Sequence, residues 1–203
     1  MSIQIRYTNL GLEITPQQAA LLTEYDKVYV WPDGLTKREE SYQNNQLTEV
    51  NYYKDATESE DDALAILMPL NVSFGIRSRQ SYGAYTIIDE NSYYQNKFSK
   101  KWKWILDARG RSICVEEIDI NTDIPMPQYT FKFLGEYVNE QSVDYCKFHY
   151  NEDGRFWFCE YNYFDEYDND EFDLARLPWI KDRFQLSDNM YNYYLSSELL
   201  PPL

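Results

Sequence analysis

The chain has 203 residues, of which 43% are hydrophobic and 17% aromatic, so a packed core is expected and a wholly disordered chain is excluded. We expect one domain over residues 1–203, with a subdivision near residues 125–127 as the alternative. With 19 Lys and Arg against 34 Asp and Glu, the net charge of −15 disfavours binding to nucleic acid or anionic membranes and favours a basic partner, unless the acidity only supports solubility.

The N-terminus MSIQIRYTNLGLEI lacks a basic segment followed by an apolar one, and the chain contains no run of about 18 apolar residues. Neither a secretion signal nor a membrane helix is therefore predicted. Three cysteines, Cys114, Cys146 and Cys159, are an odd number in a chain without an export signal, which indicates reduced thiols. We expect a cytoplasmic protein; a signal removed before this sequence begins is the alternative.

Three helices are predicted from their caps. In ITPQQAALLTEYD, Thr15 is a typical N-cap, and Pro16 suits the first helical position, where no N–H is needed. In ESEDDALAILMPL, Ser59 and Asp62 have the spacing of a capping box. In LSDNMYNYYLSSELLPPL, Ser187 is the expected N-cap of a C-terminal helix that ends before the paired prolines.

Most of the remaining chain has the composition of β-strands. β-Branched and aromatic residues form short stretches, many of them alternating with polar residues, bounded by Gly, Asn, Asp or Pro. The predicted strands cover residues 27–31, 47–53, 83–89, 101–107, 112–120, 130–138, 144–150 and 155–164. We therefore expect a strand-rich α+β fold, in which a curved antiparallel β-sheet built as a meander of hairpins is flanked by two or three short helices.

Three turns of similar composition separate aromatic strands. They are WPDG at 31–34, DARG at 107–110 and NEDG at 151–154, and each ends in the glycine that a tight turn with positive φ requires. The intervals between them are unequal, which excludes a solenoid of fixed period. Each turn is predicted to close a hairpin.

Residues 28–53, VYVWPDGLTKREESYQNNQLTEVNYY, resemble the MORN-variant repeats of some bacterial antitoxin-like proteins. In that family a tyrosine-bearing strand, an Asx-Gly turn and a second tyrosine-bearing strand recur, although the second turn here has Asn-Asn in place of Asn-Gly. The matching residues are Tyr29, Asp33, Gly34, Tyr42, the Asn44-Asn45 turn and Tyr52. The resemblance implies a binding sheet rather than an enzyme, as in a bacterial toxin-immunity protein; a plain β-meander would have the same pattern.

Cys146 and His149 have Cys-x-x-His spacing, but residues three apart on a strand lie on opposite faces. Cys146 is expected to share a face with Phe148 and Tyr150, which disfavours zinc. His149 is the only histidine, and no G-x-S-x-G elbow surrounds a serine, so no catalytic residue is predicted. No metal or cofactor is predicted either.

The stretch FWFCEYNYFDEYDNDEFD, residues 156–173, changes from an aromatic strand into a run of carboxylates interleaved with Tyr and Phe, without a base after residue 160. This composition is typical of a surface that engages Arg and Lys through charge and cation–π contact. A solvated loop or a calcium site is the alternative, although the glycine of an EF-hand loop is missing. The predicted contacts are Asp165, Glu166, Asp168, Asp170, Glu171 and Asp173, with Tyr163 and Tyr167 as anchors.

Residues 77–111 carry a local positive excess, eight Lys and Arg against three acids. The segment FSKKWKW within them combines lysines with Trp102 and Trp104, a combination that could stack on bases or sugars. The negative charge of the whole chain disfavours nucleic acid.

These patterns predict an acidic, tyrosine-rich protein-binding module that occludes a basic partner. The most concrete form is an immunity protein that neutralises a toxin or nuclease domain. The alternatives are a hydrolase that uses two carboxylates on a β-rich fold and a carbohydrate-binding domain that uses Trp102 and Trp104.

Overall fold

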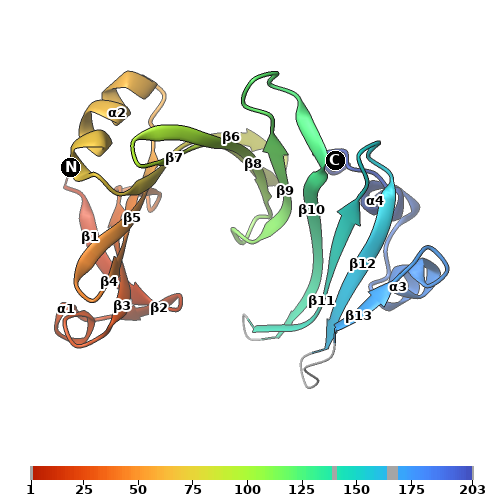
Figure 1. Ribbon diagram of the computed structural model, residues 1–203. Helices are drawn as coiled ribbons and strands as arrows, with labels where there is room; N and C mark the ends of the chain where they lie inside the picture. The colour runs from red at the N-terminus through yellow and green to blue at the C-terminus, as the bar shows by residue number, and fades with distance from the viewer. Residues whose placement is uncertain (1, 139–140, 164–168, 203) are drawn as a thin grey trace. The chain divides into compact units, whose positions relative to one another are not determined.

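The computed structural model describes residues 2–138, 141–163 and 169–202, and the side chains of residues 136–144 and 162–172 are not described. Within these residues the fold is strand-rich, with a mostly antiparallel sheet and short helices, which confirms the α+β class (Figure 1). The chain forms two compact units: unit 1 is Met1–Arg79 with Asp89–Lys101, and unit 2 is Gln80–Ile88 with Trp102–Leu203. The expected single domain, like the subdivision near residues 125–127, stays a prediction.

Unit 1 is built on a sheet with the strand order β2-β1-β3-β4-β5-β6. The pairs are antiparallel except β5 with β6, which is parallel because α2 provides the crossover that parallel strands need. The elements before the crossover are β1 (Gln4–Asn9), β2 (Leu12–Ile14), α1 (Pro16–Ala19), β3 (Glu24–Val30), β4 (Thr36–Gln43) and β5 (Gln46–Tyr53). They are followed by α2 (Glu60–Leu67), the 3-10 helix η1 (Met68–Leu70) and β6 (Ser73–Tyr82). The strands β7 (Tyr85–Tyr94) and β8 (Lys97–Leu106) follow, and β6, β7 and β8 each contribute residues to both units.

One face of the unit 1 sheet is covered by α2. The predicted capping box is confirmed, because Ser59 Oγ accepts from the Asp62 N–H and the Asp62 carboxylate accepts from the Ser59 N–H. Ala63 and Leu67 on the inner side of the helix are fully buried. The core beneath them consists of Val50, Tyr52, Phe74 and Ile76.

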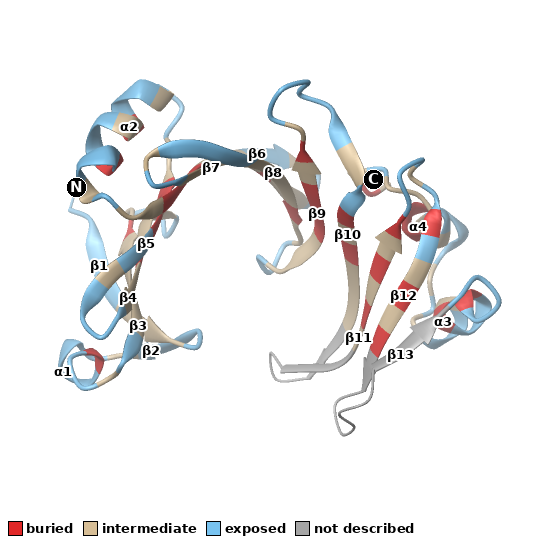
Figure 2. Cartoon of the chain, in the orientation of Figure 1, coloured by how far each residue is buried: buried red, intermediate tan, exposed pale blue. Residues whose placement is uncertain are grey.

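Unit 2 contains the strand order β9-β10-β11-β12-β13, and each of these pairs is antiparallel. Its elements are β9 (Ser112–Ile118), β10 (Pro125–Val138), β11 (Gln141–Tyr150), β12 (Phe156–Tyr163), β13 (Asn169–Phe172), α3 (Leu177–Arg183) and α4 (Asp188–Tyr194). Figure 2 shows buried residues alternating with partly buried ones along the described part of β11, and along β12 after an exposed residue near its start. The core between this face and the helices includes Cys146, Phe148, Tyr150, Cys159, Tyr161, Leu177, Ile180, Tyr193 and Tyr194.

Lys132 on β10 lies on the helix-covered face of unit 2 and is fully buried. Its Nζ donates hydrogen bonds to the carbonyl oxygens of Tyr193 and Ser196 at the C-terminal end of α4, where helix carbonyls lack intrahelical partners. The same Nζ lies 3.3 Å from the centroid of the Tyr193 ring. Burial lowers the pKa of Lys132 to about 7, against the opposing influence of Cys114 and nearby carboxylates.

Local signals for caps and turns agree with the structure. Thr15 accepts from the Gln18 N–H and Ser187 from the Met190 N–H, which confirms both predicted N-caps. The turns WPDG, DARG and NEDG share one hydrogen-bond pattern, in which the glycine N–H bonds to the carbonyl of the first turn residue. Their glycines have φ values of +88°, +79° and +79°.

Candidate functional site

Most of the partner contacts predicted from the acidic stretch cannot be placed by side chain. Asp165, Glu166, Tyr167 and Asp168 lie outside the described residues. Tyr163 belongs to β12, and Asp170 and Glu171 belong to β13; for these three residues only the backbone is described. Asp173 is exposed, and its Oδ1 accepts from the Ala175 N–H at 3.0 Å. This set of contacts therefore stays a prediction.

A second concentration of carboxylates lies on unit 1, on the sheet face opposite α2. Cross-strand pairing places Glu24 and Asp26 of β3 on this face, because Asp26 pairs with Ser41 and Ser41 with Glu49. Arg77 on β6 joins the same face through its pairing with Tyr53. We call this surface the acidic face; its carboxylates are Glu13, Glu24, Asp26, Glu39, Glu49 and Glu90.

The acidic face has a graded exposure. Glu24 and Glu49 are exposed, whereas Asp26 and Glu39 are partly buried. Burial raises the pKa of Glu39, the negative charge of Asp26 raises it further, and Arg77 opposes both. The cost of holding two carboxylates close together on a sheet would fall if a cation bound next to them.

The positive charges of this face do not balance the carboxylates. Arg77 donates from Nε to Glu90 at 2.7 Å and from Nη1 to the Tyr53 hydroxyl at 3.0 Å, so it is already engaged. Gly75 allows the close approach of Glu90, because a Cβ there would lie 3.1 Å from the Glu90 carboxylate. Arg79, two residues further along β6, lies 3.7 Å from the centroid of the Tyr53 ring and donates to the Thr36 carbonyl, and Arg6 on β1 is exposed. Three arginines thus stand against six carboxylates on the described part of this face. The face therefore remains net negative.

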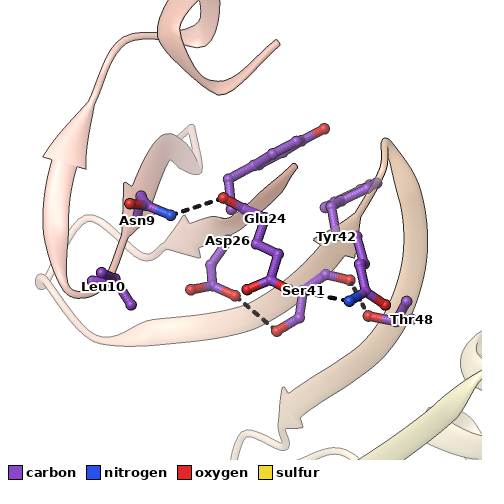
Figure 3. A pocket seen from close by; sticks show the side chains of 9 residues that line it. Asn9, Leu10, Glu24, Asp26, Ser41, Tyr42 and Thr48 are labelled. Atoms are coloured by element: carbon purple, nitrogen blue, oxygen red, sulfur yellow. Dashed lines mark hydrogen bonds between the residues drawn. The ribbon is translucent and has the colours of Figure 1, made fainter. Parts of the chain in front are cut away.

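A pocket of about 340 Å³ opens at one end of the acidic face. Hydrogen bonds fix its polar side chains to the strands. Asp26 accepts from Ser41 Oγ at 2.7 Å, and Asn9 Nδ2 donates to the Glu24 carbonyl at 2.8 Å. Figure 3 shows the β1–β2 hairpin residues Asn9 and Leu10 on one side, Tyr42 and Thr48 on the other, and Glu24, Asp26 and Ser41 between them. The pocket is lined with carboxylates and tyrosines, and no Lys or Arg is among the described residues that line it.

The opposite face of the same strands shows what an internally satisfied carboxylate looks like. Glu40 is buried and accepts hydrogen bonds from the hydroxyls of Tyr29 and Tyr42 at 3.1 and 2.9 Å. The Arg38 guanidinium also forms an ion pair with Glu40, with 2.6 Å between Nη2 and Oε1. Glu40 therefore has a structural role, as does Glu90 with Arg77 and Ser92, in contrast with the exposed Glu24 and Glu49.

Comparison with protein-family models, curated proteins and solved structures found no match. The function is therefore argued from the chain itself. Among the residues that the structure describes, no group of three or more His, Cys, Asp or Glu side chains could hold a metal ion. In the same part of the chain, no helix combines the length and the apolar composition needed to cross a bilayer.

The Cys-x-x-His pair is divided between two faces, as predicted. Cys146 lies in the unit 2 core with Phe148 and Tyr150, and all three cysteines are free and buried. His149 lies on the other face, where its ring stacks on Phe158 at 4.2 Å and its Nε2 is 3.0 Å from Glu160. These two residues therefore cannot share one ion without rearrangement of the strand.

The two tryptophans of β8 do not form the exposed, coplanar row that sugar binding would favour. The ring centroids of Trp102 and Trp104 are 6.4 Å apart, and their planes are tilted by 48°. Both side chains are partly buried. Their arrangement gives the carbohydrate alternative no specific support.

The acidic face was not predicted from the sequence. The signal that could have revealed it is the period of two in Glu24 and Asp26 on one strand and in Glu39 and Ser41 on the next. The register between β4 and β5 shifts between Ser41 and Tyr42, which changes the pairing of the residues that follow. The pattern within each strand therefore could not predict which residues of neighbouring strands share this face.

Proposed function

We propose that this chain is a protein-binding module that occludes a basic partner, most concretely a cytoplasmic immunity protein that neutralises a toxin or nuclease domain. The observation that carries the proposal is the acidic face, a sheet surface opposite α2 on which, among the described residues, carboxylates outnumber arginines. The predicted stretch at residues 160–173 and the expected curved meander of hairpins remain parts of the same proposal.

Charge is the physical basis of the proposed interaction. Enzymes that act on nucleic acid present basic surfaces to phosphates, and a net charge of −15 attracts such a surface over a distance of about a Debye length. Complementary charge raises the association rate more than the affinity, and salt removes the gain. An inhibitor of this kind should therefore bind fast at low salt and more slowly at high salt.

The first experiment is a growth test with the gene immediately upstream of this one. We expect its product, expressed alone, to stop growth, and expect coexpression of this chain to restore it. A harmless neighbour would contradict the immunity proposal. A lethal neighbour that this chain does not rescue would contradict it equally.

The second experiment places the interaction on the acidic face. In the variant with Glu24→Gln, Asp26→Asn and Glu49→Gln, the rate of association with the neutralised toxin should fall by about tenfold at low salt. This rate should also depend less on the salt concentration. The control has the same change in net charge but lies elsewhere, at the exposed residues Asp61→Asn, Glu152→Gln and Asp182→Asn. Equal effects of both triple variants would show that only net charge matters and would remove the acidic face as the site.

A further inference from the structure

The β1–β2 hairpin turns through Leu10 and Gly11, whose φ values of +50° and +79° lie in the left-handed region. Two-residue turns of this kind favour Asn, Asp and Gly, because a larger side chain in that region clashes with its own backbone. One other turn follows the preference with Asn44-Asn45 at positive φ, whereas the turn Gln95-Asn96 has a glutamine at the position that corresponds to Leu10. Leucine is therefore an unfavourable residue at this position.

Leu10 is also 91% exposed, and Leu12 beside it is 73% exposed. A leucine that is strained and solvated contributes no packing energy that would offset the strain. Leu10 lines the pocket at the end of the acidic face together with Glu24 and Asp26 (Figure 3). Leu10 thus places apolar surface beside Glu24 and Asp26, whereas Leu12 pairs with Asn9 and lies on the other face. Glu24 and Asp26 accept hydrogen bonds from Gln43 and Ser41, but no Lys or Arg is among the described residues of the pocket.

We infer that Leu10 at the tip of the β1–β2 hairpin is an apolar anchor for the partner, and that the segment it receives carries an arginine or lysine next to a large apolar side chain. The inference rests on the proposed function and specifies the chemistry of its partner. The cation would enter the pocket toward Glu24 and Asp26, while the apolar neighbour covers Leu10. Charge complementarity selects this occupant over an uncharged apolar segment, because an uncharged segment would bury these carboxylates without a counter-charge.

Two synthetic peptides test the inference by calorimetry. Acetyl-Leu-Arg-Leu-Arg-Leu-amide supplies both features, and acetyl-Ser-Arg-Ser-Arg-Ser-amide supplies the charge alone. We expect the leucine peptide to bind at least several-fold more tightly to the unmodified chain. Leu10→Asn should abolish this preference and leave the affinity for the serine peptide unchanged, whereas Asp26→Asn should weaken both.

Leu10→Asn is informative because it cannot act through unfolding. Asn tolerates the left-handed region better than Leu, so this variant should have the same or a higher melting temperature. The control is Leu21→Asn, which changes a leucine that is 87% exposed and is not among the pocket residues; both affinities should remain.

Each contrary result has a defined meaning. Equal affinity of both peptides, or a Leu10→Asn variant that keeps the preference, would overturn the anchor and leave the charge-based function in place if Asp26→Asn still weakens binding. Absence of binding by either peptide would also overturn the anchor, while the growth test decides the proposed function independently.

Discussion

Unit 1 carries carboxylates on a sheet face where Glu24 and Glu49 remain in water, whereas unit 2 encloses Lys132 completely beneath α4. The lysine has two carbonyl acceptors and an aromatic ring, and therefore contributes to holding the C-terminal segment in place. On the acidic face the negative charge of Asp26 raises the pKa of Glu39, and under the proposed function a cation of the partner would relieve this repulsion. Buried charge is thus satisfied by internal partners in unit 2, whereas unit 1 keeps carboxylates exposed to solvent.

The largest test of this contrast is Lys132→Ala. Loss of the side chain leaves a cavity and two buried carbonyls without a donor, so the free energy of unfolding should fall by about 3 kcal/mol or more. Urea unfolding followed by tryptophan fluorescence reports it, because four of the five tryptophans belong to unit 2. Lys132→Met, which keeps most of the volume and removes the cost of burying charge, should lose less; a change below about 1 kcal/mol for Ala would contradict a structural role.

The pH dependence of stability sharpens the same point. Lys132 has a folded-state pKa of about 7 against an ordinary value of 10.5, so between these values the unfolded chain binds more protons than the folded one. The free energy of unfolding should therefore rise with pH across this window, by at most about 1.4 kcal/mol per pH unit. The difference between the unmodified chain and Lys132→Met in urea unfolding isolates this contribution. A difference that stays constant or shrinks across the window would show that the burial cost is absent.

Matched glycines in the two units test how tightly each turn is packed. Gly34 and Gly154 have φ values of +88° and +79°, so alanine strains both turns by about 1–2 kcal/mol. A Cβ at Gly154 would also lie 2.6 Å from Ser197 Oγ, whereas a Cβ at Gly34 meets no atom within 4 Å. Gly154→Ala should consequently lower the melting temperature more than Gly34→Ala. Equal decreases in melting temperature for the two variants would show that Ser197 moves away from the added Cβ without loss of stability.

The smallest expected effect is a gain in stability from Glu39→Gln. The pKa of Glu39 is raised in the folded chain above the ordinary value of 4.5, which applies to the unfolded chain. Between these two pKa values the folded chain therefore binds more protons than the unfolded chain. Stability should therefore fall as pH rises through this window, and Gln should recover less than about 1 kcal/mol at neutral pH because the carboxyl is partly solvated. Chemical unfolding at pH 4 and pH 7 measures the gain, which should appear only at the higher pH. A loss of stability at pH 7 would show that this carboxylate is already compensated.

Features set by neighbouring residues were predictable from the sequence. Thr15, Ser59 and Ser187 cap their helices as expected, because a cap depends on three or four adjacent residues. The helix α3 was missed, since its N-cap is Arg176 without a side-chain hydrogen bond. The strands β1, β2, β6 and β13 were also missed, and β1, β6 and β13 carry many polar residues. The strand β4 was expected only as the second strand of the hairpin through WPDG.

Features set by pairing between strands were not predictable. The parallel pairing of β5 with β6 depends on the crossover through α2 rather than on either strand. In TFKFLGEYV, alternation alone would direct Lys132 to water and Phe131 and Phe133 to the core, yet Lys132 faces the helices. The acidic face likewise required the register of four strands.

Lys132 also constrains the order of events during synthesis. Its two acceptors lie 61 and 64 residues further along the chain. A ribosome adding about 5–20 residues per second completes β10 several seconds before these acceptors exist, and during that interval the ammonium group must stay hydrated. Docking of α4 therefore dehydrates the lysine, and it can occur only after residue 196 has been translated.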